Sequence, residues 1–157
     1  MAPDPAVDTD DVEIRRAKRG DLLAISRLEK RVFDQPWAYT AFEGFVGEPA
    51  FLLAEVDDDL LGYVVADWVP NAGGNLGHIK DLAVAPEARR NGLGRLLFRH
   101  AVSRLLVEGV ATIKLEVRAS NTAAKRLYAD EGFETVRHIP RYYSDGETAL
   151  ILVFTPN

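Results

Sequence analysis

Apolar and polar residues alternate along much of this chain with a period of two, the spacing of a strand that buries one face. The pattern is clearest over residues 112–117, where every second residue is apolar, in the order Thr112, Ile113, Lys114, Leu115, Glu116 and Val117. Six other segments have strand character, at residues 12–16, 51–56, 60–68, 78–84, 133–139 and 148–154. The chain is therefore expected to form about seven strands.

Other segments show the 3.6-residue period of an amphipathic helix. Asp21 is expected to cap the first, which runs to about Phe33 with a stripe formed by Leu22, Ile25, Leu28, Glu29 and Val32. Asn121 is expected to cap the last helix in the same way. That last helix covers residues 121–130, and two more helices are predicted over residues 39–46 and 91–107. Because strands outnumber helices and no sustained strand–helix–strand repeat occurs, the pattern predicts a mixed sheet flanked by helices.

Length and composition narrow the picture to one domain. The first 11 residues hold four aspartates and two prolines with few large apolar residues, so residues 1–11 are expected to be a disordered acidic tail. Residues 12–157 then form a single domain long enough to enclose a core.

Charge and cysteine content exclude several function classes. The net charge of −5 argues against direct nucleic-acid binding. No apolar run is long enough to span a membrane, and no secretory signal precedes the first strand. Zero Cys excludes disulfides and thiolate chemistry, and together with the lack of a signal it predicts a cytoplasmic protein. No His, Asp and Glu grouping has metal-ligand spacing, so no metal is expected.

The most informative segment joins the predicted strand at 78–84 to the helix at 91–107. Its glycines, Gly92 and Gly94, allow the backbone to approach a ligand closely, and the free N–H groups of a helix start favour a phosphate. Three arginines, Arg89, Arg90 and Arg95, add positive charge beside them. The segment therefore predicts an anion-binding loop, although a Gly-rich turn that only joins strand to helix would have the same glycines.

Two common phosphate-binding loops do not fit this segment. A Walker loop needs Gly-Lys-Ser/Thr at the helix start, which the chain lacks. A dinucleotide fingerprint needs a third glycine where Leu97 stands. The remaining pattern, Arg-x-x-Gly-x-Gly after Leu-Ala-Val, resembles the coenzyme A pyrophosphate loop of the GCN5-related N-acetyltransferase (GNAT) superfamily.

Three more motifs extend this resemblance over about residues 13–154. Residues 115–121 (LEVRASN), followed by Leu127-Tyr128 and Glu131-Gly132-Phe133, resemble the superfamily's second signature. Leu28-Glu29 through Pro36-Trp37, and the Tyr142-Tyr143 loop, are similar to segments of the ribosomal-protein-alanine and archaeal protein N-terminal acetyltransferases. The resemblance implies a GNAT-like α/β fold, with a central, mostly antiparallel sheet of about seven strands flanked by four helices.

The resemblance also assigns roles to individual residues. Glu116 matches the general base and Tyr128 the general acid that protonates the leaving thiolate. Acetyl-CoA, as cosubstrate, is expected to bind along Leu82, Ala83, Val84, Arg89, Arg90, Asn91, Gly92, Leu93, Gly94, Arg95 and Asn121. A peptide end is expected to contact Glu29, Pro36, Trp37, Tyr142 and Tyr143.

Each of these roles has a plainer alternative in the residue pattern. Glu116 lies on the polar side of its strand, where a glutamate is usually only solvated, and Tyr128 shares an apolar helix face, where a tyrosine usually packs. Asn121 can serve as a helix cap alone. His78 is a rival base near the centre of the sheet, although a lone histidine in a strand is more often structural.

The function expected from these residues is direct acetyl transfer from acetyl-CoA to the α-amine of a protein N-terminus with a small first residue, such as Ala or Ser. A ribosomal protein is one possible partner. Two alternatives remain: a lysine or small-molecule amine acetyltransferase that uses the same loop, and a non-catalytic acyl-CoA-binding module. The sequence does not choose the physiological target or the oligomeric state.

Overall fold

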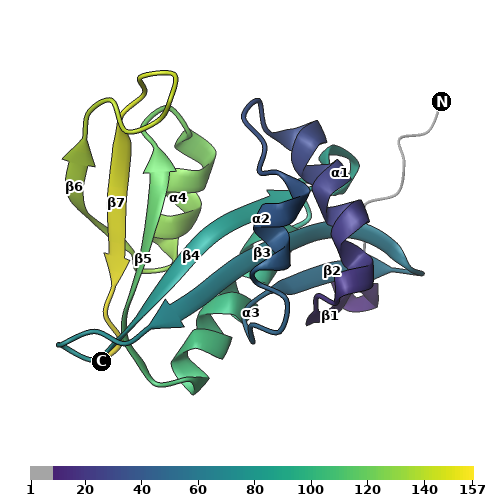
Figure 1. Ribbon diagram of the computed structural model, residues 1–157, viewed down its shortest axis with the longest axis horizontal. Helices are drawn as coiled ribbons and strands as arrows, with labels where there is room; N and C mark the ends of the chain where they lie inside the picture. The colour runs from purple at the N-terminus through teal and green to yellow at the C-terminus, as the bar shows by residue number, and fades with distance from the viewer. Residues whose placement is uncertain (1–8) are drawn as a thin grey trace.

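The computed structural model describes residues 9–157 and shows one twisted sheet with helices on both faces (Figure 1). Its seven strands are β1 (Glu13–Arg16), β2 (Leu52–Val56), β3 (Asp59–Val69), β4 (Asn75–Val84), β5 (Val110–Arg118), β6 (Glu134–Ile139) and β7 (Ala149–Phe154). Its helices are α1 (Leu22–Val32), α2 (Tyr39–Glu43), α3 (Leu93–Val107) and α4 (Thr122–Asp130). The short 3-10 turns are η1 (Thr9–Asp11), η2 (Arg19–Asp21) and η3 (Pro86–Ala88). The predicted seven strands and four helices are confirmed.

The strands lie in the order β1-β2-β3-β4-β5-β7-β6. Every neighbouring pair is antiparallel except β4 and β5, which are parallel. The connection from β4 to β5 therefore has to cross over the sheet, and it does so through α3. The mostly antiparallel mixed sheet inferred above is thus confirmed.

The parallel pair β4 and β5 separates before either strand ends. Its register runs from Asn75 opposite Val110 to Ile79 opposite Leu115, whereas β4 continues to Val84 and β5 to Arg118. Beyond this point β4 keeps its pairing with β3, and β5 keeps its pairing with β7, so the two halves of the sheet diverge (Figure 1). Beyond Ile79 and Leu115, the facing edges of β4 and β5 are therefore not paired with each other.

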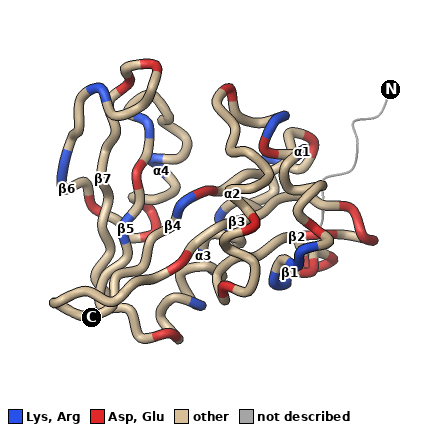
Figure 2. The backbone as a smooth tube through the Cα atoms, in the orientation of Figure 1, with Lys and Arg blue, Asp and Glu red and all other residues tan. Residues whose placement is uncertain are grey.

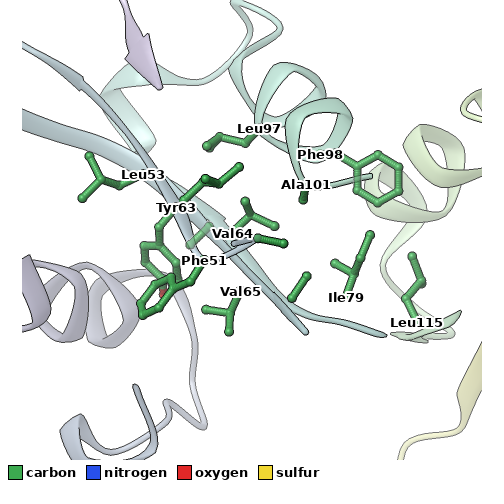
Figure 3. Packing of buried hydrophobic residues seen from close by; sticks show 14 of the residues in the cluster. Phe51, Leu53, Tyr63, Val64, Val65, Ile79, Leu97, Phe98, Ala101 and Leu115 are labelled. Atoms are coloured by element: carbon green, nitrogen blue, oxygen red, sulfur yellow. The ribbon is translucent and has the colours of Figure 1, made fainter. Parts of the chain in front are cut away.

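The core forms on both faces of the sheet. Side chains of β3 alternate between them: Tyr63 and Val65 lie on the face that α1 covers, whereas Val64 points toward α3 (Figure 3). Phe98 on α3 packs edge-on against Phe133 and at a tilt against Tyr128, which joins α3 to α4 on that second face. Full burial of each large apolar side chain contributes about 1.5–3 kcal/mol, so the helices are held to the sheet mainly by these contacts.

One expectation near the start of the chain, the helix cap at Asp21, is corrected. Thr9–Asp11 form a 3-10 turn directly before β1, and residues 1–8 lie outside the described part of the chain, so the acidic tail stays a prediction. Asp21 precedes α1, but its carboxylate accepts hydrogen bonds from the Arg15 guanidinium and the Lys18 N–H rather than capping the helix. An arginine on the adjacent strand competes successfully for that carboxylate.

Other local predictions are confirmed. Asn121 caps α4, since its Oδ1 accepts a hydrogen bond from the Ala124 N–H at 3.1 Å. In the turn that joins β2 to β3, Asp57 and Asp58 adopt positive φ angles of 50° and 67°. Within residues 9–157, no helix has both the length and the apolar content needed to cross a membrane.

Candidate active site

A pocket of about 550 Å³ opens where β4 and β5 diverge. The α1–α2 segment forms one wall and the β6–β7 loop forms the opposite wall, and both loops carry acidic residues (Figure 2). Side chains from both faces of the sheet reach it, because the divergent strands leave an opening between them. The functionally relevant lining residues are Glu29, Trp37, Asp81, Leu82, Glu116, Arg118, Asn121, Tyr128 and Tyr143.

Glu116 lies in this pocket in contact with His78. The alternation of β5 buries Leu115 and Val117 and turns Glu116 to the other face, where its side chain is 17% exposed. His78 Nε2 lies 2.6 Å from Glu116 Oε2, and Lys114 Nζ lies 3.8 Å from Oε1. Burial raises the pKa of Glu116, but the His78 hydrogen bond and the charges of His78 and Lys114 outweigh it, so the net shift is downward. Glu116 is therefore held as a carboxylate, with His78 as its partner.

Tyr128 reaches the pocket from α4, on the opposite face of the sheet. Its ring packs against Phe98 with the centroids 5.0 Å apart, so the packing role considered for this residue is real. It also lines the pocket. Burial, with a smaller contribution from the Asp81 charge, raises the pKa of Tyr128 to about 12. The phenol therefore stays protonated at neutral pH.

Glu29 lies deep in the pocket rather than at its surface. The side chain is buried on the inner face of α1, where it is 2% exposed, and Tyr63 on β3 donates a hydrogen bond to Oε1 at 2.5 Å. The Trp37 N–H donates to Oε2 at 2.8 Å, which fixes the start of the α2 segment. Glu29 therefore forms part of the pocket floor.

The four remaining peptide-binding candidates divide into lining and outer residues. Trp37 and Tyr143 line the pocket, and Trp37 is fixed by ring contacts to Phe42 and Phe45 with centroids 5.2 and 5.8 Å away. Pro36 is exposed, and Tyr142 is 47% exposed and stacks edge-on against Tyr143. The structure thus brings Trp37 and Tyr143 together with Glu29, and leaves Pro36 and Tyr142 outside the lining.

Arg118 joins the two walls of the pocket. Its guanidinium donates to Asp145 at 2.8 Å and Glu147 at 2.9 Å, and reaches Gln35 on the α1–α2 segment at 3.5 Å. It also lies 4.0 Å from the centre of the Tyr143 ring. Ser144 Oγ donates to Gln35 Oε1 at 2.7 Å, which adds a second link between the loops. We call this set (Gln35, Arg118, Tyr143, Ser144, Asp145 and Glu147) the loop clamp.

The loop between β4 and α3 has the backbone geometry that a pyrophosphate requires. Gly92 adopts a left-handed conformation at φ 75°, and a Cβ placed there would meet nothing within 4 Å, so space adjoins the backbone. The first intrahelical bond runs from Leu96 to Gly92, which leaves the N–H groups of Leu93, Gly94 and Arg95 without an acceptor in the helix. This arrangement fits an anion at the positive end of a 15-residue helix.

Side chains around this loop mostly stabilise it. Arg89 Nε donates to the Val84 carbonyl at 3.1 Å, and Asn91 Nδ2 donates to the carbonyls of Ala88 and Arg89 at 3.2 Å. Arg90 is exposed, with a φ of 70°. Arg95 does not supply unpaired charge to the loop, because its guanidinium pairs with Glu131 and Asp130 on α4 at 3.0 and 3.2 Å.

The last residues of β4 connect this loop to the pocket. Leu82 lines the pocket, and its N–H donates to Asp81 Oδ1 at 2.9 Å. Ala83 is buried and Val84 ends the strand, where its Cγ2 lies 3.6 Å from the position of a Cβ at Gly94. Among residues 9–157, no group of three or more His, Asp or Glu side chains is arranged to hold a metal ion.

Two residues that the sequence does not single out, Arg118 and Asp81, also line the pocket. Arg118 could have been found, because it lies two residues after Glu116 and therefore on the same face of β5. Asp81 gives no such signal, since its burial depends on α1 packing over β4. The sequence offers His78 and Glu116 as alternative bases, but the register that pairs β4 with β5 makes them neighbours.

Known proteins share this architecture and sequence. The Acetyltransferase (GNAT) family model matches residues 20–133. The ribosomal-protein-alanine N-acetyltransferase of Salmonella typhimurium is 34% identical, with 87% of this chain and 91% of that protein covered. The N-alpha-acetyltransferase of Sulfurisphaera tokodaii is 31% identical, with 88% and 90% covered.

A solved structure shows the same fold at lower sequence identity. A chain in the crystal structure of the NatC complex bound to Gag peptide and CoA superposes with a TM-score of 0.87 at 21% identity, covering 94% of this chain and 99% of that one. The sequence matches show the family of this chain, and the divergent β4–β5 pair and the Gly-rich loop are consistent with it. The chain is an N-acetyltransferase and belongs to the GNAT family.

Proposed function

We propose that this enzyme transfers the acetyl group of acetyl-CoA directly to the α-amine of a protein N-terminus whose first residue is small, such as Ala or Ser. Two relatives more than 30% identical over most of their length are named for alanine N-acetylation of a ribosomal protein and for N-alpha acetylation. A ribosomal protein is accordingly one candidate partner. The zero Cys content is consistent with direct transfer, because a cysteine acyl-enzyme is excluded.

The observation that carries this proposal is the position of Glu116 and Tyr128 in one pocket, reached from opposite faces of the sheet. Bound acetyl-CoA supplies a thioester whose carbonyl carbon an amine attacks and whose thiolate leaves. An α-amine has a pKa of about 7.7–8, so a carboxylate that accepts its proton, directly or through one water, shifts a nearly balanced equilibrium. Glu116, held ionised beside His78, supplies that carboxylate.

Tyr128 supplies the proton that the leaving group requires. A thiol has a pKa of about 8.5, well below the value of about 12 to which burial raises the pKa of Tyr128. The phenol is therefore protonated throughout the neutral range and can donate a hydrogen bond to sulfur as negative charge develops there. Full transfer of the proton is uphill by the difference between the two pKa values, so it completes as solvent water returns a proton to the phenolate. The ring contact with Phe98 holds the hydroxyl in place.

The Gly-rich loop after β4 fits the pyrophosphate of the cosubstrate. The backbone N–H groups of Leu93 and Gly94, at the start of α3, are available to donate hydrogen bonds to the pyrophosphate. Arg89 and Arg90 lie next to them in the sequence. Asn121, which lines the pocket while it caps α4, is placed to contact the pantetheine arm.

The shape of the pocket favours a chain end over an internal lysine. Trp37 on one wall and Tyr143 on the other enclose it, and the loop clamp ties these walls together. An internal lysine arrives with chain on both sides, whereas an N-terminus leaves in one direction only. Because Trp37 is fixed by Phe42 and Phe45, the wall cannot move far to admit a large first side chain.

A panel of peptides tests this function. Peptides with free Ala, Ser, Leu or Phe N-termini are compared with matched peptides whose N-termini are acetyl-capped and which contain one internal Lys. We expect acetylation of free Ala and Ser ends, weaker acetylation of Leu and Phe ends, and none of the capped peptides. Equal rates on the capped lysine peptides would assign the enzyme to lysine or small-amine acetylation instead, and tight acetyl-CoA binding without any turnover would indicate a non-catalytic module.

A further inference from the structure

A buried pair of carboxyl groups forms the floor of the pocket, where α1 faces β3 and β4. One member is Glu29, whose two oxygens each accept a hydrogen bond: Oε1 from the Tyr63 hydroxyl at 2.5 Å and Oε2 from the Trp37 N–H at 2.8 Å. The other member is Asp81 on β4. Its carboxyl group lies within hydrogen-bonding reach of Glu29.

The two oxygens of Asp81 have different surroundings. Oδ1 accepts a hydrogen bond from the Leu82 N–H at 2.9 Å. Oδ2 is buried and, among residues 9–157, has no hydrogen-bond donor as its partner. An unsatisfied buried carboxylate oxygen beside a second carboxylate is costly, since both desolvation and like-charge repulsion oppose it. A proton on Oδ2 removes both costs, because the O–H then donates to Glu29.

The charged groups around Asp81 also favour a proton on this carboxyl group. Glu29 on α1, Tyr63 on β3 and Tyr128 on α4 face Asp81, and none of them is a cation. The adjacent Lys80 pairs instead with Asp67 on β3, at 3.4 Å. Burial, together with Glu29, raises the pKa of Asp81 to about 9. Both oxygens of Glu29 already accept a hydrogen bond, whereas Oδ2 of Asp81 accepts none from residues 9–157.

We propose that Asp81 is a positioning residue for acetyl transfer: as a neutral carboxylic acid it donates a hydrogen bond from Oδ2 to Glu29 and holds that carboxylate as a single negative charge at the pocket floor. The role of the charge, to attract and orient the substrate's α-ammonium group, rests on the proposed function. The hydrogen bond itself does not.

Substitutions that keep or remove the donor separate positioning from simple packing. Asp81→Asn retains the arrangement, because its Nδ2 can donate to Glu29 while Oδ1 still accepts from Leu82. Asp81→Leu has a similar size but no donor. Asp67→Asn is the matched control, since it removes another partly buried carboxyl from the same sheet, outside the pocket.

Two readouts test the proton on Asp81 without any substrate. Infrared spectroscopy at neutral pH should show the carbonyl stretch of a protonated carboxyl group in the wild type and in Asp67→Asn, and this band should be absent from Asp81→Asn. The thermal midpoint gives a second readout. The folded-state pKa is raised, so the stability from this group is present below the unfolded-state pKa of about 3.8 and is lost as pH rises to about 9. The midpoint of Asp81→Asn relative to wild type should therefore rise across that range.

Peptide kinetics then test the positioning role. We expect the peptide KM of Asp81→Leu to exceed that of Asp81→Asn by about tenfold, the loss expected for a hydrogen bond to a charged group. Acetyl-CoA affinity should match between the two variants.

Absence of the protonated-carboxyl band from the wild type, or its persistence in Asp81→Asn, would overturn the proposal. So would equal KM values for the Asn and Leu variants on a peptide that the wild type acetylates. A wild-type enzyme that acetylates no peptide N-terminus would refute the proposed function instead, while the band and the thermal midpoints would still decide the state of Asp81.

Discussion

His78 Nε2 and Glu116 Oε2 lie 2.6 Å apart, and this contact bridges β4 and β5 immediately before the two strands separate. It makes one unit of two residues that the sequence offers as alternatives. The carboxylate faces the pocket and the imidazole orients it from the side, an arrangement in which His78 supports the charge of Glu116.

Removing the proton acceptor should cost turnover most strongly at acid pH. Glu116→Gln keeps the side-chain shape, and we expect kcat/KM to fall on the order of 10²-fold at neutral pH. Below the amine pKa of about 7.7–8, fewer substrate amines are already neutral, so the deficit should grow as pH falls. Steady-state kinetics between about pH 6 and pH 9 measure this change.

The partner residue provides the comparison for that measurement. His78→Asn should lower activity less than Glu116→Gln, because the carboxylate remains. The assignment of the base is wrong if Glu116→Gln keeps the wild-type profile while His78→Asn loses activity at low pH.

Stability should respond to Glu116 with a definite sign. The pKa of this carboxyl is lowered in the folded protein, so its contribution is present above the unfolded-state value of about 4.5 and is lost as pH falls through the folded-state pKa. Thermal midpoints of wild type and Glu116→Gln should converge as the buffer becomes more acidic in that range. A midpoint difference that stays constant with pH would contradict the lowered pKa.

Tyr128→Phe removes only a hydroxyl group. Since the ring keeps its contact with Phe98, we expect an unchanged thermal midpoint and unchanged acetyl-CoA affinity. Turnover should fall about 10²-fold if the phenol is the proton donor. Near-normal turnover would show that Tyr128 only packs.

The Gly-rich loop can be tested against a matched glycine elsewhere. Gly92 and Gly109 both have positive φ angles, 75° and 79°, and a Cβ at either meets nothing within 4 Å. A Val at either position therefore strains the backbone similarly, by about 1–3 kcal/mol, but only Gly92→Val should obstruct a bound pyrophosphate. Calorimetry should show weak acetyl-CoA binding for Gly92→Val and near-normal binding for Gly109→Val. Similar affinities in the two variants would remove the phosphate site from this loop.

Arg118 is predicted to control peptide binding through the loop clamp. Arg118→Lys keeps a positive charge but loses the planar guanidinium that contacts Asp145, Glu147 and the Tyr143 ring together. We expect a higher peptide KM with little change in acetyl-CoA affinity. Arg19→Lys, at an exposed ion pair with Glu43, is the control and should leave both unchanged. A normal peptide KM for Arg118→Lys would show that peptide binding does not depend on the link that Arg118 makes between the α1–α2 segment and the β6–β7 loop.

The sequence predicted most of the fold because its elements carry strong local signals. Ile113, Leu115 and Val117 are buried as their alternation indicates, and Asn121 caps α4 as expected. Asp21 shows the limit of local reasoning, since its carboxylate is taken by Arg15 from a neighbouring strand. No local rule of helix capping includes that competitor.

The site was predictable where a motif fixes it and unpredictable where packing does. Glu116, Tyr128 and Asn121 line one pocket, and the roles that the resemblance assigns to them stay predictions. The pairing of Arg95 with Glu131, and the burial of Asp81 beside Glu29, depend on how α4 packs beside α3 and how α1 packs over β4. Such contacts join residues far apart in the sequence, so composition and periodicity do not show them.

A single peptide that carries both a free N-terminal Ala and an internal Lys shows which amine the enzyme prefers, when the acetylated nitrogen is mapped by mass spectrometry. Both amines then compete at the same concentration for the same enzyme. We predict that early product carries its acetyl group on the α-amine of Ala, with the lysine side chain unmodified. Early product acetylated mainly on the lysine would contradict the account.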